Sequence, residues 1–235
     1  MREPGYFYSD HLGLNVDFVW YGKKGRPLVL FPTSGGDQGE NEERGLIGAL
    51  QPFIDEGRLQ AVCVNSINNQ SWGDKTLAYA EKMRRYDLYD RFLAEEFAPF
   101  VTKHAHDREL MVYGASFGGF HAVNFAARHP ELVKRCIAFS GFFDLKRVTY
   151  GWWNDQCYFH SPEAFIPNMD GEWIRRLRSV EWVIATGDQD SLADETRRLG
   201  AIFKAKGVPA TVELWPDCFG HDWPFWKSHL PRFVV

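Results

Sequence analysis

The feature that most restricts the fold of this chain is a glycine-flanked turn between a strand pattern and a helix pattern. Leu110-Met111-Val112-Tyr113 is a continuous apolar run, and it leads directly into Gly114-Ala115-Ser116-Phe117-Gly118-Gly119. Residues 117–128 then follow a helical pattern that stops at His129-Pro130. A strand can pass into a helix this sharply only when the positions two before and two after the central serine carry no bulky side chain. The sequence therefore predicts a tight strand-to-helix turn with Ser116 at its apex.

Strand and helix patterns alternate along the chain, which is typical of a mostly parallel sheet with helices on both faces. Residues 141–178 are irregular, rich in aromatic residues and too long for an ordinary connection, so we expect a cap segment with short helices of its own. No repeat or linker divides the chain, and we expect a single α/β domain over residues 1–235. We predict strands over residues 15–21, 28–31, 59–64, 110–113, 133–139, 180–186 and 210–215, and helices over residues 87–102, 117–128, 192–206 and 223–233.

Charge and composition exclude some classes of protein and favour others. The formal net charge of −4 argues against a nucleic-acid-binding protein, which needs a basic face for the phosphates. No apolar stretch is long enough to cross a bilayer, and the N-terminus lacks the apolar core of a secretory signal, so we expect a cytoplasmic protein without a membrane partner. The four cysteines form no paired motif and are expected to be buried thiols, although a Cys157–Cys218 disulfide is left open. Two aromatic clusters, over residues 150–159 and 215–226, leave room for an apolar pocket wall beside their role in the core.

Ser116 becomes a nucleophile only with a base and an acid that orients the base. On a strand–turn–helix scaffold of this kind, these partners follow the serine in the order acid, then histidine. His221 lies in a loop after the last predicted strand and is the candidate base. Asp188 and Asp190 both follow the preceding strand; we favour Asp190 because it lies further along the loop, and Asp188 stays the alternative. Asp194 is set aside because Ser191-Leu192-Ala193-Asp194 resembles a capping box.

A serine nucleophile also needs donors for the negative charge that develops on the substrate oxygen. The first expected donor is the backbone amide of Phe117, the residue after the serine. The second should come from a loop after an early strand, and Phe31-Pro32-Thr33-Ser34-Gly35-Gly36 is that loop. We predict the Ser34 amide as this donor, with Thr33 as the alternative. The loop lacks the Gly-Lys-Ser/Thr ending of a phosphate-binding loop, which argues against nucleotide binding.

With these residues in place, the sequence resembles the esterase D-type esterases of the α/β-hydrolase superfamily. The resemblance rests on the Ser116 turn, on Arg128-His129-Pro130, on Ser140-Gly141, on the stretch 158–162 and on Gly220-His221-Asp222-Trp223. It implies an α/β-hydrolase fold and a serine esterase that needs no metal and no organic cofactor. The family nucleophile falls on Ser116, its base on His221 and its acid on Asp190. Many relatives have His-Gly-Gly where this chain has Pro32-Thr33-Ser34, and this departure affects the second oxyanion donor.

The sequence therefore predicts a serine carboxylic-ester hydrolase that works through an acyl-enzyme intermediate on a small-molecule ester. Two alternatives stay open. The same residues could pass the acyl group to an alcohol or thiol, or the chain could be a non-catalytic ligand-binding member of the fold. The sequence determines neither the natural ester nor whether the chain forms homo-oligomers.

Overall fold

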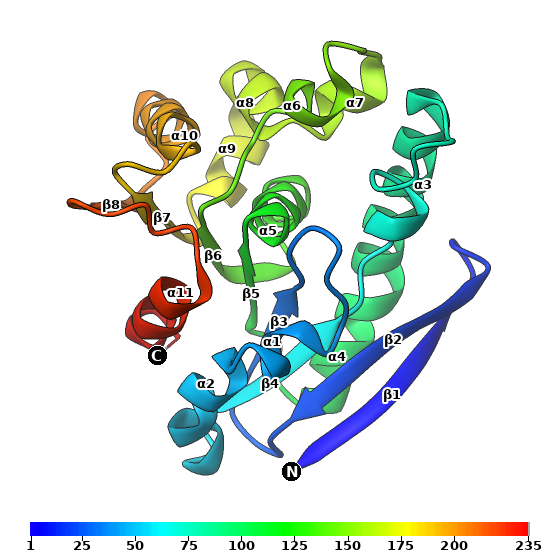
Figure 1. The fold of residues 1–235 in the computed structure, drawn as a ribbon, viewed down its shortest axis with the longest axis vertical. Coiled ribbons are helices and arrows are strands. Elements are labelled where there is room, and N and C mark those ends of the chain that lie inside the picture. The colour runs from blue at the N-terminus through cyan, green and yellow to red at the C-terminus, as the bar shows by residue number, and fades with distance from the viewer. Residues whose placement is uncertain (235) are drawn as a thin grey trace.

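A computed structural model describes residues 1–234 of the chain, and within them eight strands form one sheet (Figure 1). The strand order is β1-β2-β4-β3-β5-β6-β7-β8. β1 pairs with β2 and β2 with β4 in antiparallel fashion, and all other neighbours are parallel. The strands are β1 (Arg2–Ser9), β2 (Leu14–Tyr21), β3 (Arg26–Phe31), β4 (Leu59–Val64), β5 (Leu110–Ala115), β6 (Val133–Phe139), β7 (Glu181–Gly187) and β8 (Ala210–Trp215). The predicted mostly parallel α/β sheet is confirmed.

Helices cover both faces of this sheet because the central strands are apolar on both sides. Along β3, Leu28 and Leu30 face one core, whereas Val29 and Phe31 face the other. One face is covered by α3 (Tyr79–Arg91), α4 (Ala98–Ala105), α5 (Phe117–Arg128) and α10 (Ala193–Ala205), and the other by α2 (Leu46–Asp55) and α11 (Trp223–His229) (Figure 1). The remaining helices are α1 (Glu40–Glu43), α6 (Lys146–Thr149), α7 (Asp155–Phe159), α8 (Pro162–Phe165) and α9 (Gly171–Leu177), with short 3₁₀ turns at Asn68–Gln70, Ile166–Asn168 and Leu230–Arg232.

The predicted cap segment is a series of short helices. α6, α7, α8 and α9 all fall within residues 141–178 and lie along one end of the molecule above α5 (Figure 1). Phe142, Phe143 and Phe165 from this segment are buried against the core on the α5 face. The segment therefore packs as part of the domain.

The structure differs from the predicted elements in three places. The strand β1 is not among the predicted strands; it contains Pro4 and lies at the edge of the sheet, where a proline costs no internal ladder hydrogen bond. The helix expected over residues 87–102 begins at Tyr79 and continues through a π-helical turn, Phe92–Phe97, to Ala105. The helix α10 is not capped by Ser191, since its N-cap residue is Leu192 and no side chain caps it.

No helix within residues 1–234 is both long enough and apolar enough to span a membrane. The same residues contain no group of three or more His, Cys, Asp or Glu side chains that could hold a metal ion.

Candidate active site

Ser116 lies at the apex of the predicted turn, between the end of β5 and the start of α5. Its backbone has φ 55° and ψ −119°, a strained conformation for a residue with a side chain. Such conformations cost on the order of 1–3 kcal/mol and persist only where the surrounding structure enforces them. A Cβ on Gly114 would lie 1.9 Å from the Gly118 carbonyl oxygen, and a Cβ on Gly118 would lie 2.8 Å from the carbonyl oxygens of Phe31 and Pro32. Close backbone packing therefore holds the turn, and glycine is the only residue that fits at both positions.

His221 and Asp190 lie next to this serine, in the order that the sequence predicts. The Nε2 atom of His221 is 3.1 Å from Ser116 Oγ. On the other side of the ring, Nδ1 is 2.9 Å from Asp190 Oδ2 and 3.2 Å from Oδ1. Because a carboxylate only accepts hydrogen bonds, the proton of the neutral imidazole lies on Nδ1, which leaves the Nε2 lone pair directed at the serine hydroxyl.

The environment of Asp190 keeps its carboxylate ionised and fixed. The side chain is buried and accepts hydrogen bonds from the Thr186 hydroxyl at 2.5 Å and from the Leu192 amide at 2.9 Å, besides the one from His221. Burial alone would raise the pKa of Asp190, but these three hydrogen bonds outweigh burial and lower the pKa below its ordinary value. The group is therefore a carboxylate at neutral pH, able to accept a hydrogen bond from His221 Nδ1.

The other two candidate aspartates point elsewhere. Asp188 accepts a hydrogen bond from the Cys218 amide at 3.3 Å and makes none with His221. Asp194 pairs with Arg197 at 2.7 Å on the exposed side of α10. The predicted capping box is wrong because Asp190 Oδ1 accepts from the Leu192 amide in place of a Ser191 cap.

The loop that carries His221 is held by contacts which the sequence did not reveal. Ser140 donates a hydrogen bond to the Gly220 carbonyl at 2.9 Å and accepts one from the Trp226 indole at 3.1 Å. A Cβ on Gly187 would lie 2.3 Å from the Cys218 and Phe219 carbonyl oxygens, so the backbones after β7 and β8 pack directly on each other. The Ser140-Gly141 pair was noticed only as part of the family resemblance, because a buried serine after a strand carries no signal of its own.

The glycine-rich loop after β3 also lies at this edge of the sheet. Glu40, in the first turn of α1, accepts hydrogen bonds from the Thr33 amide at 2.8 Å and the Thr33 hydroxyl at 2.7 Å. The Thr33 amide is therefore already engaged, whereas no described residue accepts from the Ser34 amide. Phe117 occupies the first position of α5, where a helix offers its amide no acceptor. The geometry thus favours Ser34 over Thr33 as partner of Phe117.

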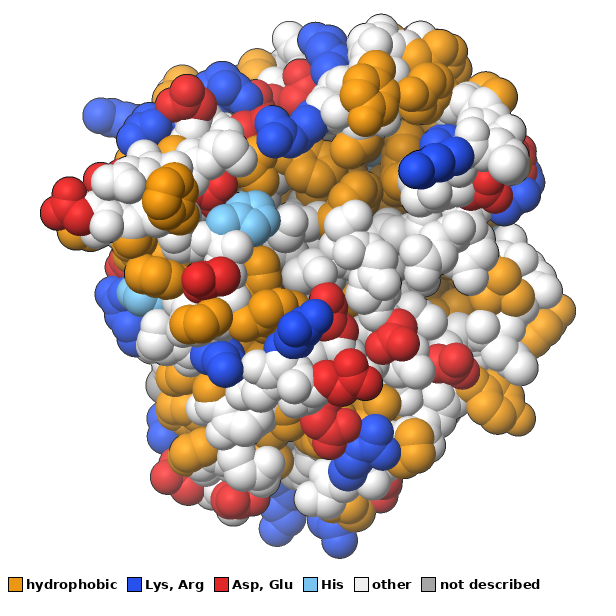
Figure 2. Space-filling view, in the orientation of Figure 1, with side chains coloured by type: hydrophobic (Ala, Val, Ile, Leu, Met, Phe, Trp, Pro, Cys, Tyr) orange, Lys and Arg blue, Asp and Glu red, His pale blue; other side chains and the backbone are white. Residues whose placement is uncertain are grey.

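A cleft of about 620 Å³ opens beside these two residues. We call it the Phe117 cleft and define it by Ser34, Asn68, Trp72, Lys82, Phe117 and Arg147. Figure 2 shows this face of the molecule hollowed between the end of α3 and the cap, with Lys or Arg side chains on both sides. Of the two aromatic clusters in the sequence, only the first reaches the cleft, through Tyr150. Trp215 of the second packs on Phe139 in the core.

The mostly parallel sheet, the covering helices and the turn at the end of β5 define the chain as an α/β hydrolase. The profile of the family described as "Putative esterase" matches residues 53–234, and the chain belongs to this family of ester hydrolases. No curated protein matches the sequence.

Solved structures share the fold at low sequence identity. A ferulic acid esterase superposes with a TM-score of 0.75 at 20% identity, over 100% of this chain and 96% of its own. An S-formylglutathione hydrolase from Agrobacterium tumefaciens gives 0.75 at 15% identity, with 100% and 94% covered. The fluorophosphonate-binding serine hydrolase F of Staphylococcus aureus gives 0.71 at 16% identity, with 100% and 96% covered. These similarities support the predicted α/β-hydrolase fold across the whole chain.

Proposed function

We propose that this protein is a serine carboxylic-ester hydrolase in which Ser116 is the nucleophile, His221 the general base and Asp190 the orienting acid. The observation that carries the proposal is the series of hydrogen bonds from Ser116 Oγ through both ring nitrogens of His221 to Asp190. A serine and a histidine in this relation, with a buried carboxylate behind them, are the minimum for acyl transfer through a covalent intermediate.

In the first half of the reaction, His221 Nε2 takes the proton of Ser116 as Oγ attacks the ester carbonyl carbon. The negative charge that forms on the carbonyl oxygen is stabilised by the amides of Phe117 and Ser34, at the N-terminus of α5 and in the β3 loop. When the tetrahedral intermediate collapses, the protonated His221 gives its proton to the departing alkoxide. The alcohol leaves and the acyl group stays on Ser116 as an ester.

In the second half, His221 removes a proton from a water molecule, which attacks the acyl-enzyme and releases the carboxylic acid. The side chain of His221 is 33% exposed, so water reaches the base without a large opening movement. This exposure favours hydrolysis over transfer to another alcohol or thiol, because transfer requires that water be excluded at the acyl-enzyme stage.

A fluorophosphonate probe tests the nucleophile directly. We expect Ser116 Oγ to attack the phosphorus, displace fluoride and form a stable adduct at this one residue, located by mass spectrometry. Ser116→Ala should abolish both labelling and hydrolysis of 4-nitrophenyl esters. Ser179→Ala removes an exposed hydroxyl that bonds only the Arg176 carbonyl, and it should change neither. An unlabelled wild-type protein that leaves every ester intact would mean a binding protein rather than an enzyme.

The proposal includes a small-molecule ester as substrate and a cytoplasmic, reducing setting. The second point is supported by the four cysteines, which are all free thiols in the structure. Cys157 is buried, and neither it nor Cys218 takes part in a disulfide.

A further inference from the structure

The Phe117 cleft has an unusual charge for a protein with an excess of acidic residues. Lys75, Lys82 and Arg147 line it, and no Asp or Glu does. Arg147 is partly neutralised by Glu195 at 3.4 Å, and Lys75 is exposed to solvent. Lys82 is the buried cation of the three; Asp74 interacts with it electrostatically but forms no ion pair with it.

Lys82 is only 8% exposed and projects from the first turn of α3. Its Nζ donates to the Trp72 carbonyl at 3.2 Å and lies 5.4 Å from the ring centre of Tyr79. Among residues 1–234 it forms no ion pair with a carboxylate. Removing an ammonium group from water costs several kcal/mol unless an opposite charge compensates it, and a single carbonyl does not provide that charge. This lysine is therefore suited to receive an anion from outside the chain.

Two residues that line the same cleft carry a buried hydrogen-bond donor without a partner. The indole nitrogen Nε1 of Trp72 and the amide nitrogen Nδ2 of Asn68 are both buried, and neither donates to any described residue. Buried donors normally find an acceptor, and each one left unpaired destabilises the fold. A carboxylate has two oxygens and about four acceptor positions, so it can take hydrogen bonds from several donors at once.

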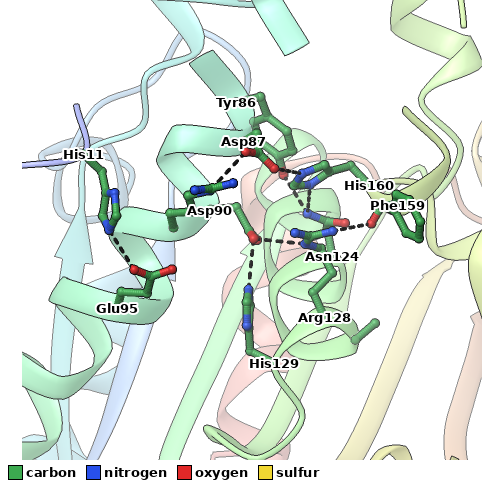
Figure 3. Close-up of polar contacts among 12 residues, drawn as sticks. His11, Tyr86, Asp87, Asp90, Glu95, Asn124, Arg128, His129, Phe159 and His160 are labelled. Carbon is green, nitrogen blue, oxygen red and sulfur yellow. Dashed lines mark hydrogen bonds and ion pairs between the residues drawn. The ribbon is translucent and has the colours of Figure 1, made fainter. Parts of the chain in front are cut away.

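A buried series of hydrogen bonds fixes which end of the Asn68 amide is available. Asn68 Oδ1 lies 3.1 Å from His121 Nε2, and His121 Nδ1 lies 3.2 Å from the Tyr86 hydroxyl. Asn124 Nδ2 bonds both Tyr86 and His160 Nδ1, and His160 Nε2 lies 3.1 Å from Asp87 Oδ1, as Figure 3 shows for these last four residues.

The series has one consistent direction when both histidines are neutral. Burial lowers the pKa of His121 to about 3 and also lowers the pKa of His160, so both rings carry a single proton at neutral pH. His160 then donates to Asp87 and accepts from Asn124, while His121 accepts from Tyr86 and donates to Asn68 Oδ1. The oxygen of the Asn68 side chain is thus engaged, and its NH₂ group is the end left for a ligand.

We infer that Lys82, Trp72 and Asn68 form a subsite that binds a negatively charged group, namely a carboxylate. This carboxylate belongs to the ester that Ser116 cleaves. The inference rests on the proposed esterase function and names its substrate class: esters that carry an anionic group at a distance from the scissile bond. Phe117 lines the same cleft beside Ser116, so one substrate spans both the reacting carbonyl and this subsite.

The test compares esters that differ only in a remote carboxylate. Mono-4-nitrophenyl adipate and 4-nitrophenyl hexanoate share a six-carbon acyl chain and differ in the charge at its end. 4-Acetoxybenzoate and 4-acetoxybenzamide place the same difference on the alcohol side. We expect the wild type to favour the anionic member of at least one pair by tenfold or more in kcat/KM, mainly through a lower KM.

Variants at Lys82 separate charge recognition from a structural role. Lys82→Met keeps the apolar stem and should bring the ratio of kcat/KM for the anionic ester to kcat/KM for the neutral ester close to one. Lys82→Arg should keep most of the preference. Lys204→Met, which removes an exposed lysine on α10 outside the cleft, serves as the matched control and should behave as the wild type.

Two results would overturn the subsite while the esterase function stands: no preference for either anionic ester, or a preference that Lys82→Met leaves intact. If Ser116 cleaves no ester at all, the proposed function fails, and the subsite is judged by calorimetry with adipate alone. The proposed subsite is supported if the wild type binds adipate and Lys82→Met does not. It is overturned if the wild type does not bind adipate.

Discussion

Replacing Asp190 by asparagine is expected to abolish most of the activity by changing the tautomer of His221. In the native site, Oδ1 accepts from the Leu192 amide, and Oδ2 accepts from Thr186 and from His221 Nδ1. An asparagine must keep its oxygen toward Leu192, because an NH₂ group there would face another N–H donor. Its NH₂ group then replaces Oδ2 and donates to His221 Nδ1. The ring proton moves to Nε2, which can no longer accept the proton of Ser116.

The size of this effect follows from the loss of the base and not from the loss of a contact. A histidine held in the wrong tautomer reduces kcat by roughly 10³- to 10⁴-fold, which corresponds to about 4–5.5 kcal/mol of transition-state stabilisation. The side chains are nearly isosteric, and the Thr186 hydroxyl can turn to accept from the new amide. We therefore expect the free energy of unfolding to change by no more than about 1–2 kcal/mol.

The assay is kcat/KM for a 4-nitrophenyl ester, with thermal unfolding followed by circular dichroism to establish that each variant is folded. Asp188→Asn is the matched control in the same loop, since Asp188 bonds only the Cys218 amide. We expect it to retain activity within about fivefold of the wild type. If Asp188→Asn were the more damaging change, or if Asp190→Asn kept more than a tenth of the activity, the argument from hydrogen-bond direction would be wrong.

Three further predictions concern the support of the site. Gly118→Ala should lower kcat/KM by about 10²-fold, because its Cβ would push on the backbone carbonyls at the end of β3. The control is Gly48→Ala, which should leave activity unchanged because a Cβ there meets nothing within 4 Å. Equal activity of the two variants would refute this prediction. Ser140→Ala should reduce kcat by roughly tenfold and change KM less, because the Gly220 carbonyl loses its hydrogen-bond donor. An unchanged kcat would show that the loop of His221 keeps its position without this hydrogen bond. The pKa of His121 is lowered by burial to about 3, so its contribution to stability is complete above the unfolded pKa of about 6.5 and is lost as the pH falls from there toward 3. In urea unfolding between pH 7 and 5, the free energy of unfolding should accordingly fall more steeply in the wild type than in His121→Gln, by up to about 1.4 kcal/mol per pH unit, while the contribution of His160 remains in both; equal slopes would contradict this.

Where strands and helices have strong apolar patterns, their positions could be read from the sequence. β4, β6, β8 and α5 have the predicted bounds; β4, β6 and α5 are runs of mostly buried residues, whereas β8 is an edge strand that lies between clear turns. The first part of α3 could not be found in this way. Residues 79–86 are mostly charged or polar, and only Met83 and Tyr86 among them are apolar side chains buried in the core. Ion pairs of Glu81 with Arg84 and Arg85 lie on the more exposed side of the same helix.

The residues of the candidate site also fall into those that the sequence predicts and those that it does not. Ser116, Asp190 and His221 lie directly after strands of a parallel sheet, so chain order alone brings them to one edge. Thr186 and Lys82 were not foreseen because their importance depends on burial and on partners far away in the sequence. From the sequence alone, Lys82 resembles a solvent-exposed lysine of a charged helix. The structure shows that it is buried and that its Nζ contacts the Trp72 carbonyl.

The distance along the chain between nucleophile and base has a consequence for how the protein becomes active during synthesis. Ser116 and His221 are 105 residues apart, and His221 follows β8, the last strand along the chain and one of the two edge strands of the sheet. A ribosome-bound chain can complete the strand–turn–helix unit around Ser116 long before residue 221 has been translated. If His221 is the base, as proposed, Ser116 lacks it until β8 pairs with β7 and the Gly220 carbonyl meets Ser140. On the proposed function, we therefore expect the nascent chain to hydrolyse esters only when the sheet is complete.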